Sequence, residues 1–245
     1  MPDQFPNHAR FIRRLEMATS LDSCDKAVLR AMPMRLVNVG AKSEVVAEGQ
    51  TPHESCIILS GVACRQRMLP QGARQILSFH FSGDLPDLQS LYLAEMDHTI
   101  VTTTEALLGY VPHAVLREMS DTRPNIARAL SAHSLVDAAI FREWIVNIGR
   151  RPALMRTAHL LCEIYARMRA MSLARNGTMI LPLTQIDLAD ALGLSTVHVN
   201  RVLQALRRDG LIKSEGKQHV IADWAGLQSA GAFNDRYLHL SAGTA

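Results

Sequence analysis

Residues 184–208 decide the fold, and they read TQIDLADALGLSTVHVNRVLQALRR. Thr184 followed by Asp187 predicts a capping box at the start of a short helix. Gly193 stands where a tight turn needs a positive φ, and Ser195 can cap a second helix. The apolar positions that tie the two helices together are Leu188, Leu192, Leu194, Val199 and Val202. This spacing of small residue, turn glycine and buried branched residue is typical of a helix-turn-helix.

The second helix exposes residues suited to reading base edges in a major groove. Arg201 can bond the O6 and N7 atoms of a guanine, and Asn200 can pair in a similar way with an adenine. Val197 or the methyl group of Thr196 can contact a thymine methyl group, and His198 can bond a base or a phosphate. The alternative is that these are solvated surface side chains.

Basic residues follow the second helix and predict contacts with phosphates. They are Arg207, Arg208, Lys213 and Lys217, and the alternative is a solvated basic face. Residues 211–213 and 219–221 are apolar-rich runs joined by 214–217, a pattern that indicates a β-hairpin. A helix-turn-helix followed by such a hairpin is a winged helix.

The sequence before residue 184 contains two regions with different residue patterns. From residue 34 to 112, short β-branched runs are separated by regularly spaced glycines, which predicts a small antiparallel barrel or sandwich. Residues 125–148 contain no Gly or Pro and predict a long helix, with Asp121 as its cap and Pro124 in its first turn. Because this helix is apolar around most of its girth, either a partner subunit or its own chain must cover more than one side. Residues 147–152 predict a break and a hinge near Gly149.

Composition and charge exclude several classes of protein. Of the 245 residues 48% are apolar and 20% charged, which excludes a disordered chain. The start of the sequence carries no apolar signal-peptide core, and no uncharged run approaches the ~20 residues that span a bilayer. The four cysteines form no CxxC motif, so we expect reduced thiols and a cytoplasmic location. Residues 1–148 carry 14 Lys and Arg against 16 Asp and Glu, whereas residues 149–245 carry 12 against 7, so the basic part is C-terminal.

The order of these segments resembles the Crp-Fnr family of transcription regulators. The resemblance is carried by Gly49, residues 58–61 (ILSG), Gly72, Gly83-Asp84 and above all residues 188–212. It implies an α+β fold with an N-terminal antiparallel, jelly-roll-like β-roll, a long dimerisation helix and a C-terminal winged helix-turn-helix. We assign these to residues 1–120, 121–148 and 149–245. The implied partners are a second copy of the chain, double-stranded DNA with a palindromic operator, and RNA polymerase.

The resemblance also suggests roles for particular residues. Thr184 and Lys217 match phosphate contacts, and the DNA-binding set as a whole is Thr184, Ser195, Thr196, Val197, His198, Asn200, Arg201, Arg207 and Lys217. Arg201 agrees with the usual arginine of the family, whereas Val197 stands where many members have a base-reading glutamate. The operator sequence is therefore expected to differ from the usual one.

The effector site departs further from the family pattern. Nucleotide-binding members have a glutamate after the Gly-Asp turn and then an arginine that holds the cyclic phosphate. Here the segment offers Asp87 and then Asp97-His98, and no Arg or Lys lies between Arg74 and Arg117. We therefore expect no cyclic AMP binding of the family kind. Cys24 stands alone near the N-terminus, so no iron-sulfur cluster is expected either, and the effector is unknown.

Two alternatives stay open at this stage. One is a small-ligand-binding β-barrel with a helical tail that binds proteins, and the other is a metal-dependent barrel enzyme. His53, His80, His98 and His113 show no metal-ligand spacing, and no catalytic motif is present, so we expect no enzyme, no metal and no cofactor. Cys56, Cys64 and Cys162 are expected in the core, and a redox role for Cys24 is left open.

Overall fold

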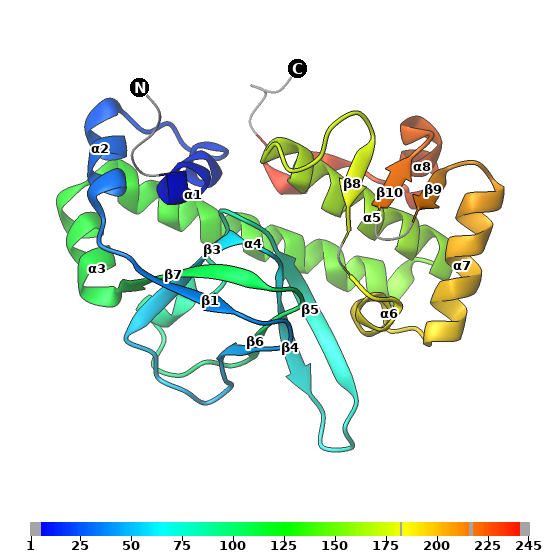
Figure 1. Ribbon diagram of the computed structural model, residues 1–245, viewed down its shortest axis with the longest axis horizontal. Coiled ribbons are helices and arrows are strands. Elements are labelled where there is room, and N and C mark those ends of the chain that lie inside the picture. Colours follow the sequence, from blue (N-terminus) through cyan, green and yellow to red (C-terminus); the bar gives the residue numbers. More distant parts are fainter. Residues whose placement is uncertain (1–5, 182, 216–217, 241–245) are drawn as a thin grey trace. The chain divides into compact units, whose positions relative to one another are not determined.

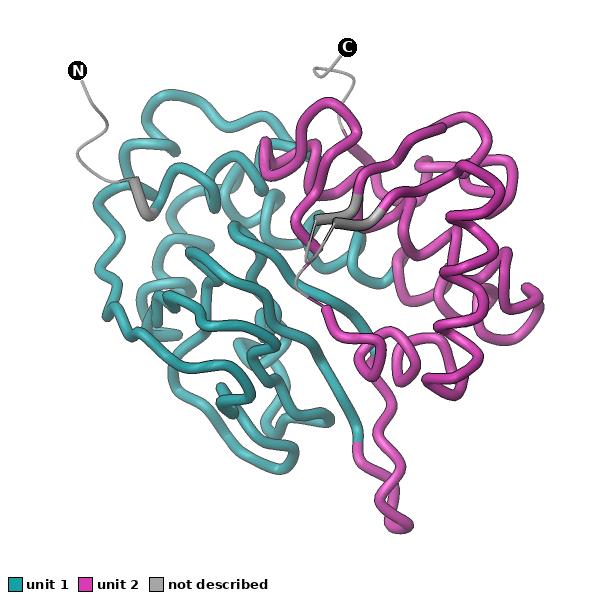
Figure 2. Tube along the Cα trace, turned by 45° about the vertical axis from the view of Figure 1, so that its right-hand side comes forward, with its two compact units in different colours: residues 1–67, 77–138 teal, residues 68–76, 139–245 magenta. Residues whose placement is uncertain are grey.

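The computed structural model describes residues 6–181, 183–215 and 218–240 (Figure 1). The chain divides into two compact units (Figure 2). Unit 1 comprises the residues up to 67 and residues 77–138, and unit 2 comprises residues 68–76 and the chain from 139 onward. The boundary falls within one long helix, α4 (Pro124–Arg150). Each unit is described by itself.

The β-roll of unit 1 consists of two antiparallel sheets. Its strands are β1 (Arg35–Val39), β2 (Glu44–Val46), β3 (Glu54–Ser60), β4 (Ala63–Met68), β5 (Arg74–His80), β6 (Thr99–Thr102) and β7 (Ala106–Pro112). Residues 68–76, which include the end of β4 and the start of β5, are grouped with unit 2. One sheet has the order β1-β7-β3 and the other the order β2-β6-β4-β5. The predicted antiparallel β-roll is confirmed.

The edge strand β3 contains a continuous apolar run, residues 56–59, because both of its faces are buried there. Cys56 and Ile58 point into the roll, where they pack with Ile100 and Leu108. Ile57 points the other way, into a second core formed with the helices. Alternating side chains leave a strand on opposite faces, so a strand with two covered faces reads as a continuous apolar run.

Helices cover one face of the roll and share its second core. They are α1 (Pro6–Glu16), α2 (Ser23–Ala31), the short 3₁₀ helix η1 (Leu88–Leu91), α3 (His113–Thr122) and the first half of α4. Phe11 and Leu15 of α1 pack with Leu116 of α3 and with Ile126 and Leu130 of α4 in this core. The turn from β3 to β4 depends on Gly61, which has a φ of +87° and whose added Cβ would collide with the backbone of Glu105 and Ala106.

The structure corrects the predicted start of α4 and places its end within the predicted break. Asp121 does not cap this helix, because it lies inside α3, and α4 begins at Pro124, one residue after the C-cap of α3. At the other end the helix continues through Gly149 to Arg150, so it ends within the predicted break at residues 147–152. The break comes at Pro152, which is the N-cap of α5 (Ala153–Ala170), since a proline at that point cannot continue the hydrogen bonds of the preceding helix.

The winged helix of unit 2 follows α5. Its elements are β8 (Thr178–Ile180), α6 (Gln185–Leu192), α7 (Thr196–Arg208), β9 (Ile212–Glu215), β10 (Gln218–Ile221), α8 (Trp224–Gly231) and the 3₁₀ helix η2 (Asp235–Leu238). The strands pair in the order β8-β10-β9, so the predicted hairpin is confirmed and gains β8 as a third strand. Among the described residues, no helix is long and apolar enough to cross a membrane.

Candidate nucleic-acid interface

The first helix of the motif, α6, is set by local hydrogen bonds at both ends. The Thr184 hydroxyl accepts a hydrogen bond from the Asp187 backbone N–H at 3.1 Å, and the Asp187 carboxylate accepts one from the Thr184 N–H at 3.0 Å. At the other end Gly193 has a φ of +62°, in the left-handed region. The N–H of Leu194 then reaches back to the carbonyl of Ala189. The chain therefore turns sharply after α6, as the sequence predicts.

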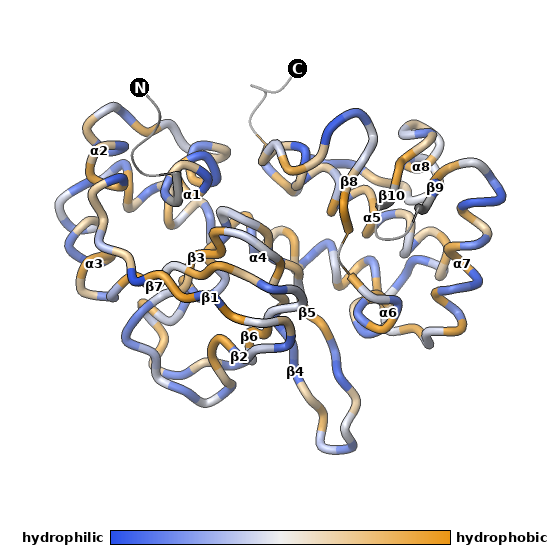
Figure 3. Tube along the Cα trace, viewed as in Figure 1, coloured by the Kyte–Doolittle hydropathy of each residue, from blue (hydrophilic) through white to orange (hydrophobic). Residues whose placement is uncertain are grey.

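The second helix, α7, begins at the predicted cap and divides into a buried and an exposed face. Ser195 accepts a hydrogen bond from the His198 N–H at 3.2 Å. The buried side chains are Val199, Val202, Leu203 and Leu206. Hydrophobic and hydrophilic residues accordingly mix along the trace of α7 (Figure 3). The buried positions recur at three- and four-residue steps and hold α7 against the rest of unit 2.

The exposed face of α7 carries most of the predicted DNA-reading residues. Thr196, Val197 and Arg201 are exposed, and Val197 leaves 68% of its surface open although it is apolar. His198 and Asn200 flank this face and are half-buried. Gln204, which the sequence analysis did not select, is exposed on the same stripe, three residues after Arg201 and seven after Val197. The helical period alone places it there.

The basic residues around α7 lie in different environments. Arg208 and Lys213 are exposed, Arg207 is half-buried, and Thr184 and Ser195 are exposed at the two helix starts. The guanidinium of Arg208 lies 3.2 Å from the carboxylate of Asp209, so part of its charge is already balanced. Lys217 lies outside the described residues.

Arg74 balances the acidic residues of α6. It belongs to the segment 68–76 of unit 2, and its Nη2 lies 2.8 Å from Asp187 while its Nε lies 2.6 Å from Asp190. Two carboxylates on the first helix of a DNA-binding motif would repel a phosphate backbone. The double ion pair reduces that repulsion.

Comparisons with known proteins agree with both halves of this architecture. A family model described as a Crp-like helix-turn-helix domain matches residues 155–230, and one described as a cyclic nucleotide-binding domain matches residues 36–123. The chain is 33% identical over 183 residues to the Transcriptional activator protein FnrL of Cereibacter sphaeroides, with 73% of each chain covered. The chain belongs to the Crp-Fnr family of transcription regulators.

Other Crp-Fnr relatives support the same assignment. The Nitrogen fixation regulation protein FixK of Bradyrhizobium diazoefficiens is 27% identical over 203 residues, which cover 82% of this chain and 83% of the relative. The solved structure of FixK2 from Bradyrhizobium japonicum superposes with a TM-score of 0.75 at 24% identity, covering 81% of this chain and 98% of that one, and this likeness shows the fold. These relatives are described as regulators, not as enzymes.

Asp87 and Asp97, the acidic residues of the segment expected to hold an effector, are already engaged in hydrogen bonds. Asp87 is buried and both of its carboxylate oxygens accept from the Cys56 N–H at 2.9 Å. Burial raises the pKa of Asp87 to about 7, against the lowering effect of this hydrogen bond and of the Arg65 charge. Asp97 and His98, which stand near the position of the phosphate-binding arginine, are hydrogen-bonded to each other at 2.7 Å.

One arginine does enter the roll, and the sequence analysis did not find it. Arg65 on β4 is buried; its Nε donates to the carbonyl of Pro86 at 2.7 Å and its Nη2 lies 2.9 Å from Asp137 of α4. Arg65 precedes Gly83-Asp84 in another strand, outside the segment in which the family pattern places its phosphate-binding arginine. A guanidinium already paired with a carboxylate has little charge left to offer a phosphate.

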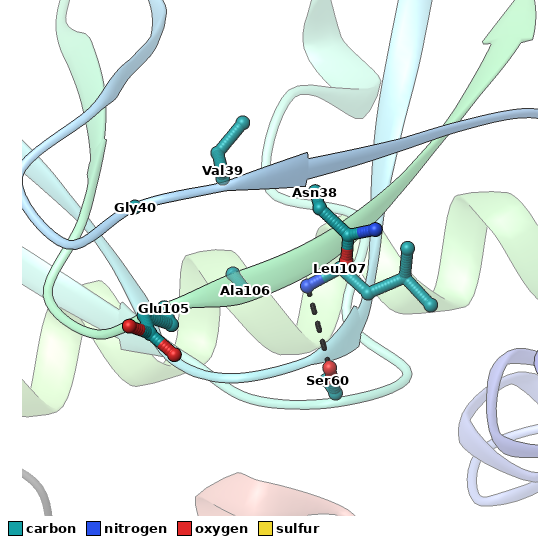
Figure 4. Close-up of a pocket in the computed structure, with 7 residues that line it drawn as sticks. All are labelled: Asn38, Val39, Gly40, Ser60, Glu105, Ala106 and Leu107. Carbon is teal, nitrogen blue, oxygen red and sulfur yellow. Dashed lines mark hydrogen bonds between the residues drawn. The ribbon is translucent and has the colours of Figure 1, made fainter.

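A hollow of about 600 Å³ opens at one end of the β1-β7-β3 sheet (Figure 4). Its lining residues are Asn38, Val39, Gly40, Ser60, Glu105, Ala106 and Leu107. Glu105 is the one charged side chain in this lining, and the Leu107 N–H donates to Ser60 at 3.3 Å. Such a lining offers no positive charge to an anionic ligand.

The cysteines and histidines form no metal site among the described residues. Cys56, Cys64 and Cys162 are buried as predicted, and Cys24 is exposed. Burial raises the pKa of the Cys56 thiol and brings that of Cys162 to about 12, so these two thiols stay protonated and unreactive at neutral pH. His80, which the sequence left as either a barrel or a surface residue, is buried inside the roll.

Proposed function

We propose that this regulator binds a two-fold symmetric DNA operator as a homodimer. The proposal rests on the two faces of α7. Val199 and Leu206 are fully buried on one face, and Val197 and Arg201 are exposed on the opposite face. A helix held rigidly from behind, with a polar and basic face in front, is suited to enter a major groove. Thr196, His198 and Asn200 would complete the base-reading set, and Thr184, Ser195, Arg207 and Lys217 would contact phosphates.

A stripe along α4 supports the dimer. Exposed or half-buried residues recur at alternating three- and four-residue steps, which is the spacing of a coiled-coil seam. We call this stripe the α4 seam, and its residues are Arg128, Ser131, Leu135, Ala138, Arg142, Ile145 and Gly149. Leu135 is 69% exposed and Ile145 is 71% exposed, so the described residues of the chain leave both side chains largely uncovered. A second copy of the helix supplies an apolar partner by symmetry.

Selection of bound duplexes from random-sequence DNA by the purified protein tests the proposal. We expect enrichment of an inverted repeat whose half-sites lie about one helical turn apart, near 34–36 Å. Binding should weaken steeply as salt rises, because phosphate contacts release counterions. An enriched site without two-fold symmetry would contradict the dimer, and no enrichment would contradict DNA reading.

Arg201→Ala tests the recognition helix itself. The loss of a bidentate guanine contact should cost ~1–3 kcal/mol at the selected operator and relax the preference at one base pair. Arg236→Ala removes the same charge from η2 and serves as the control. An unchanged preference in Arg201→Ala would exclude Arg201 from base reading.

We further propose that the regulator acts in the cytoplasm, contacts RNA polymerase and does not respond to cyclic AMP or to an iron-sulfur cluster. The support for the last point is the paired state of Arg65, the buried Asp87 and the lone Cys24. Cyclic AMP added to the selected operator complex should leave the DNA affinity unchanged. A rise in affinity would contradict this part of the proposal.

A further inference from the structure

One hydrogen bond joins the two helices of the DNA-binding motif at their exposed side. The amide nitrogen of Asn200, on α7, donates to the amide oxygen of Gln185, on α6, at 3.1 Å. Gln185 is the first residue of α6 and is exposed, whereas Asn200 is half-buried. Because the residues are 15 positions apart, the contact exists only when both helices are in place.

This bond decides which way the Asn200 amide faces. One N–H of Asn200 is used by Gln185. Within residues 6–181, 183–215 and 218–240 the carbonyl oxygen and the second N–H of Asn200 make no hydrogen bond, so they are left for another partner. These two groups match an adenine edge, whose N6 amine donates and whose N7 accepts. A free asparagine side chain would have to give up rotamer and amide freedom on binding, and Gln185 removes part of that cost in advance.

The side-chain amide nitrogen of Gln185 is available for a further hydrogen bond. Among the described residues its own amide nitrogen makes no hydrogen bond, and it lies at the N-terminal turn of α6, directly after Thr184. The first helix of this motif crosses the phosphate backbone, and the N-terminal end of a helix favours negative charge. A phosphate oxygen is therefore the partner that fits the Gln185 amide nitrogen.

We propose that Gln185 is a specificity-positioning residue: it donates to a backbone phosphate and at the same time holds Asn200 in the orientation that reads adenine. The inference rests on the proposed DNA-binding function and adds a residue to it. It couples the sequence-independent contact of α6 to a sequence-dependent contact of α7. Gln185 itself touches no base, so its effect on specificity passes entirely through Asn200.

Four variants separate this role from a simple phosphate contact: Gln185→Ala, Gln185→Glu, Asn200→Ala and the double alanine variant. Each is titrated against the selected operator and against duplexes in which one base pair at a time is changed. Asn200→Ala should flatten the preference at one base pair. Gln185→Ala should reduce the preference at that same base pair by roughly 3- to 10-fold, and should have no further effect on it in the Asn200→Ala background.

Gln185→Glu separates the proposed phosphate contact of Gln185 from its proposed positioning of Asn200. Glutamate keeps an oxygen that accepts from Asn200 but replaces the donor with a negative charge facing the phosphate. It should therefore retain the base preference while lowering the affinity for every duplex. Gln228→Ala, the same chemical change on α8 as Gln185→Ala, serves as the control, and thermal unfolding checks that each variant is folded.

The possible failures are distinguishable. If the wild-type chain enriches no DNA, both the proposed function and this inference are overturned. If it enriches an operator but Gln185→Ala weakens all duplexes equally, the DNA-binding function stands and the positioning role is wrong. Independent losses of preference in Gln185→Ala and Asn200→Ala that simply add in the double variant would also overturn the inference.

Discussion

Arg65 and Asp137 form an ion pair inside unit 1 that leaves only 4% and 12% of their side chains exposed. Burial alone would raise the pKa of Asp137, but the Arg65 charge overcomes this and the pKa is lowered. Both groups have therefore been taken out of water, and each depends on the other for its compensation. The pair connects β4 to α4 across 72 residues of sequence.

Removing one partner of this pair should be more harmful than removing both. Arg65→Met leaves the Asp137 carboxylate buried without its cation and should lower the free energy of unfolding by about 3–5 kcal/mol. The double variant Arg65→Met, Asp137→Leu should recover most of that loss. Urea denaturation of the wild type, both single variants and the double variant measures the effect. A double variant as unstable as the sum of the singles would contradict the coupling.

We predict that His80 lowers the stability of the folded chain in mild acid. Burial, with a smaller contribution from Arg65, lowers the pKa of His80 to about 4 in the folded chain, against an ordinary value near 6.5. Below pH ~6.5 the imidazole is therefore protonated in the unfolded chain, whereas in the folded chain it is protonated only near pH ~4. The stability that His80 contributes is fully present above pH ~6.5 and is lost as the pH falls toward 4.

His80→Gln removes this titration while keeping a polar group beside Ser78, whose hydroxyl lies 2.8 Å from the His80 ring. Between pH 6.5 and 4 the wild type should lose up to roughly 3 kcal/mol more than His80→Gln. Denaturation midpoints and slopes measured across this range test it, with His53→Gln, which removes an exposed imidazole, as the control. Parallel pH profiles for wild type and His80→Gln would contradict the prediction.

Among whole elements, the 3₁₀ helix η2 is joined to two helices of unit 2 by hydrogen bonds to a buried carboxylate. Glu163 of α5 is fully buried and accepts hydrogen bonds from Trp144 of α4 at 3.0 Å and from the Tyr237 hydroxyl of η2 at 2.8 Å. His159 lies 3.1 Å from the same hydroxyl. Tyr237 lies beyond residue 230, where the match to the family helix-turn-helix model ends, so this contact joins a residue outside the matched region to Glu163 inside it.

Tyr237→Phe should destabilise unit 2 by about 1–3 kcal/mol, because it removes one donor from a buried carboxylate and leaves the aromatic packing in place. Chemical denaturation followed by far-UV circular dichroism measures the change. Tyr92→Phe removes a hydroxyl from a side chain that is 73% exposed and controls for the loss of the group itself. Equal stabilities of the two variants would show that the Glu163 contact contributes nothing.

The whole molecule is expected to function as a pair of chains joined along the α4 seam. Leu135→Glu combined with Ile145→Glu places two carboxylates on this seam and opposite their symmetry copies. The variant should sediment as a monomer and lose most of its affinity for the two-fold operator. Because both positions are exposed within the chain, its thermal unfolding should change little apart from losing its dependence on protein concentration.

Leu93→Glu is the matched control for the seam, since Leu93 is 55% exposed but lies outside α4. It should leave the oligomeric state and the DNA affinity unchanged. A seam variant that stays dimeric in analytical ultracentrifugation would place the dimer contact elsewhere. Half-site DNA, which needs only one recognition helix, should bind the wild type and the seam variant with similar affinity.

Sequence alone predicted the features that depend on neighbouring residues. The capping box of Thr184 and Asp187, the left-handed Gly193 and the Ser195 cap are all contacts within a few positions of the chain, so the residue types carry the information. The period of α7 likewise separated buried Val199 from exposed Arg201. The roll, the long helix and the winged helix followed from such local patterns, taken together with the family resemblance.

Only the tertiary structure showed the contacts between segments that are far apart in sequence. Strand β8 is three residues long, too short for a pattern, and exists because β10 pairs with it. Arg65 with Asp137 and Gln185 with Asn200 join different elements, and no local spacing connects the members of either pair.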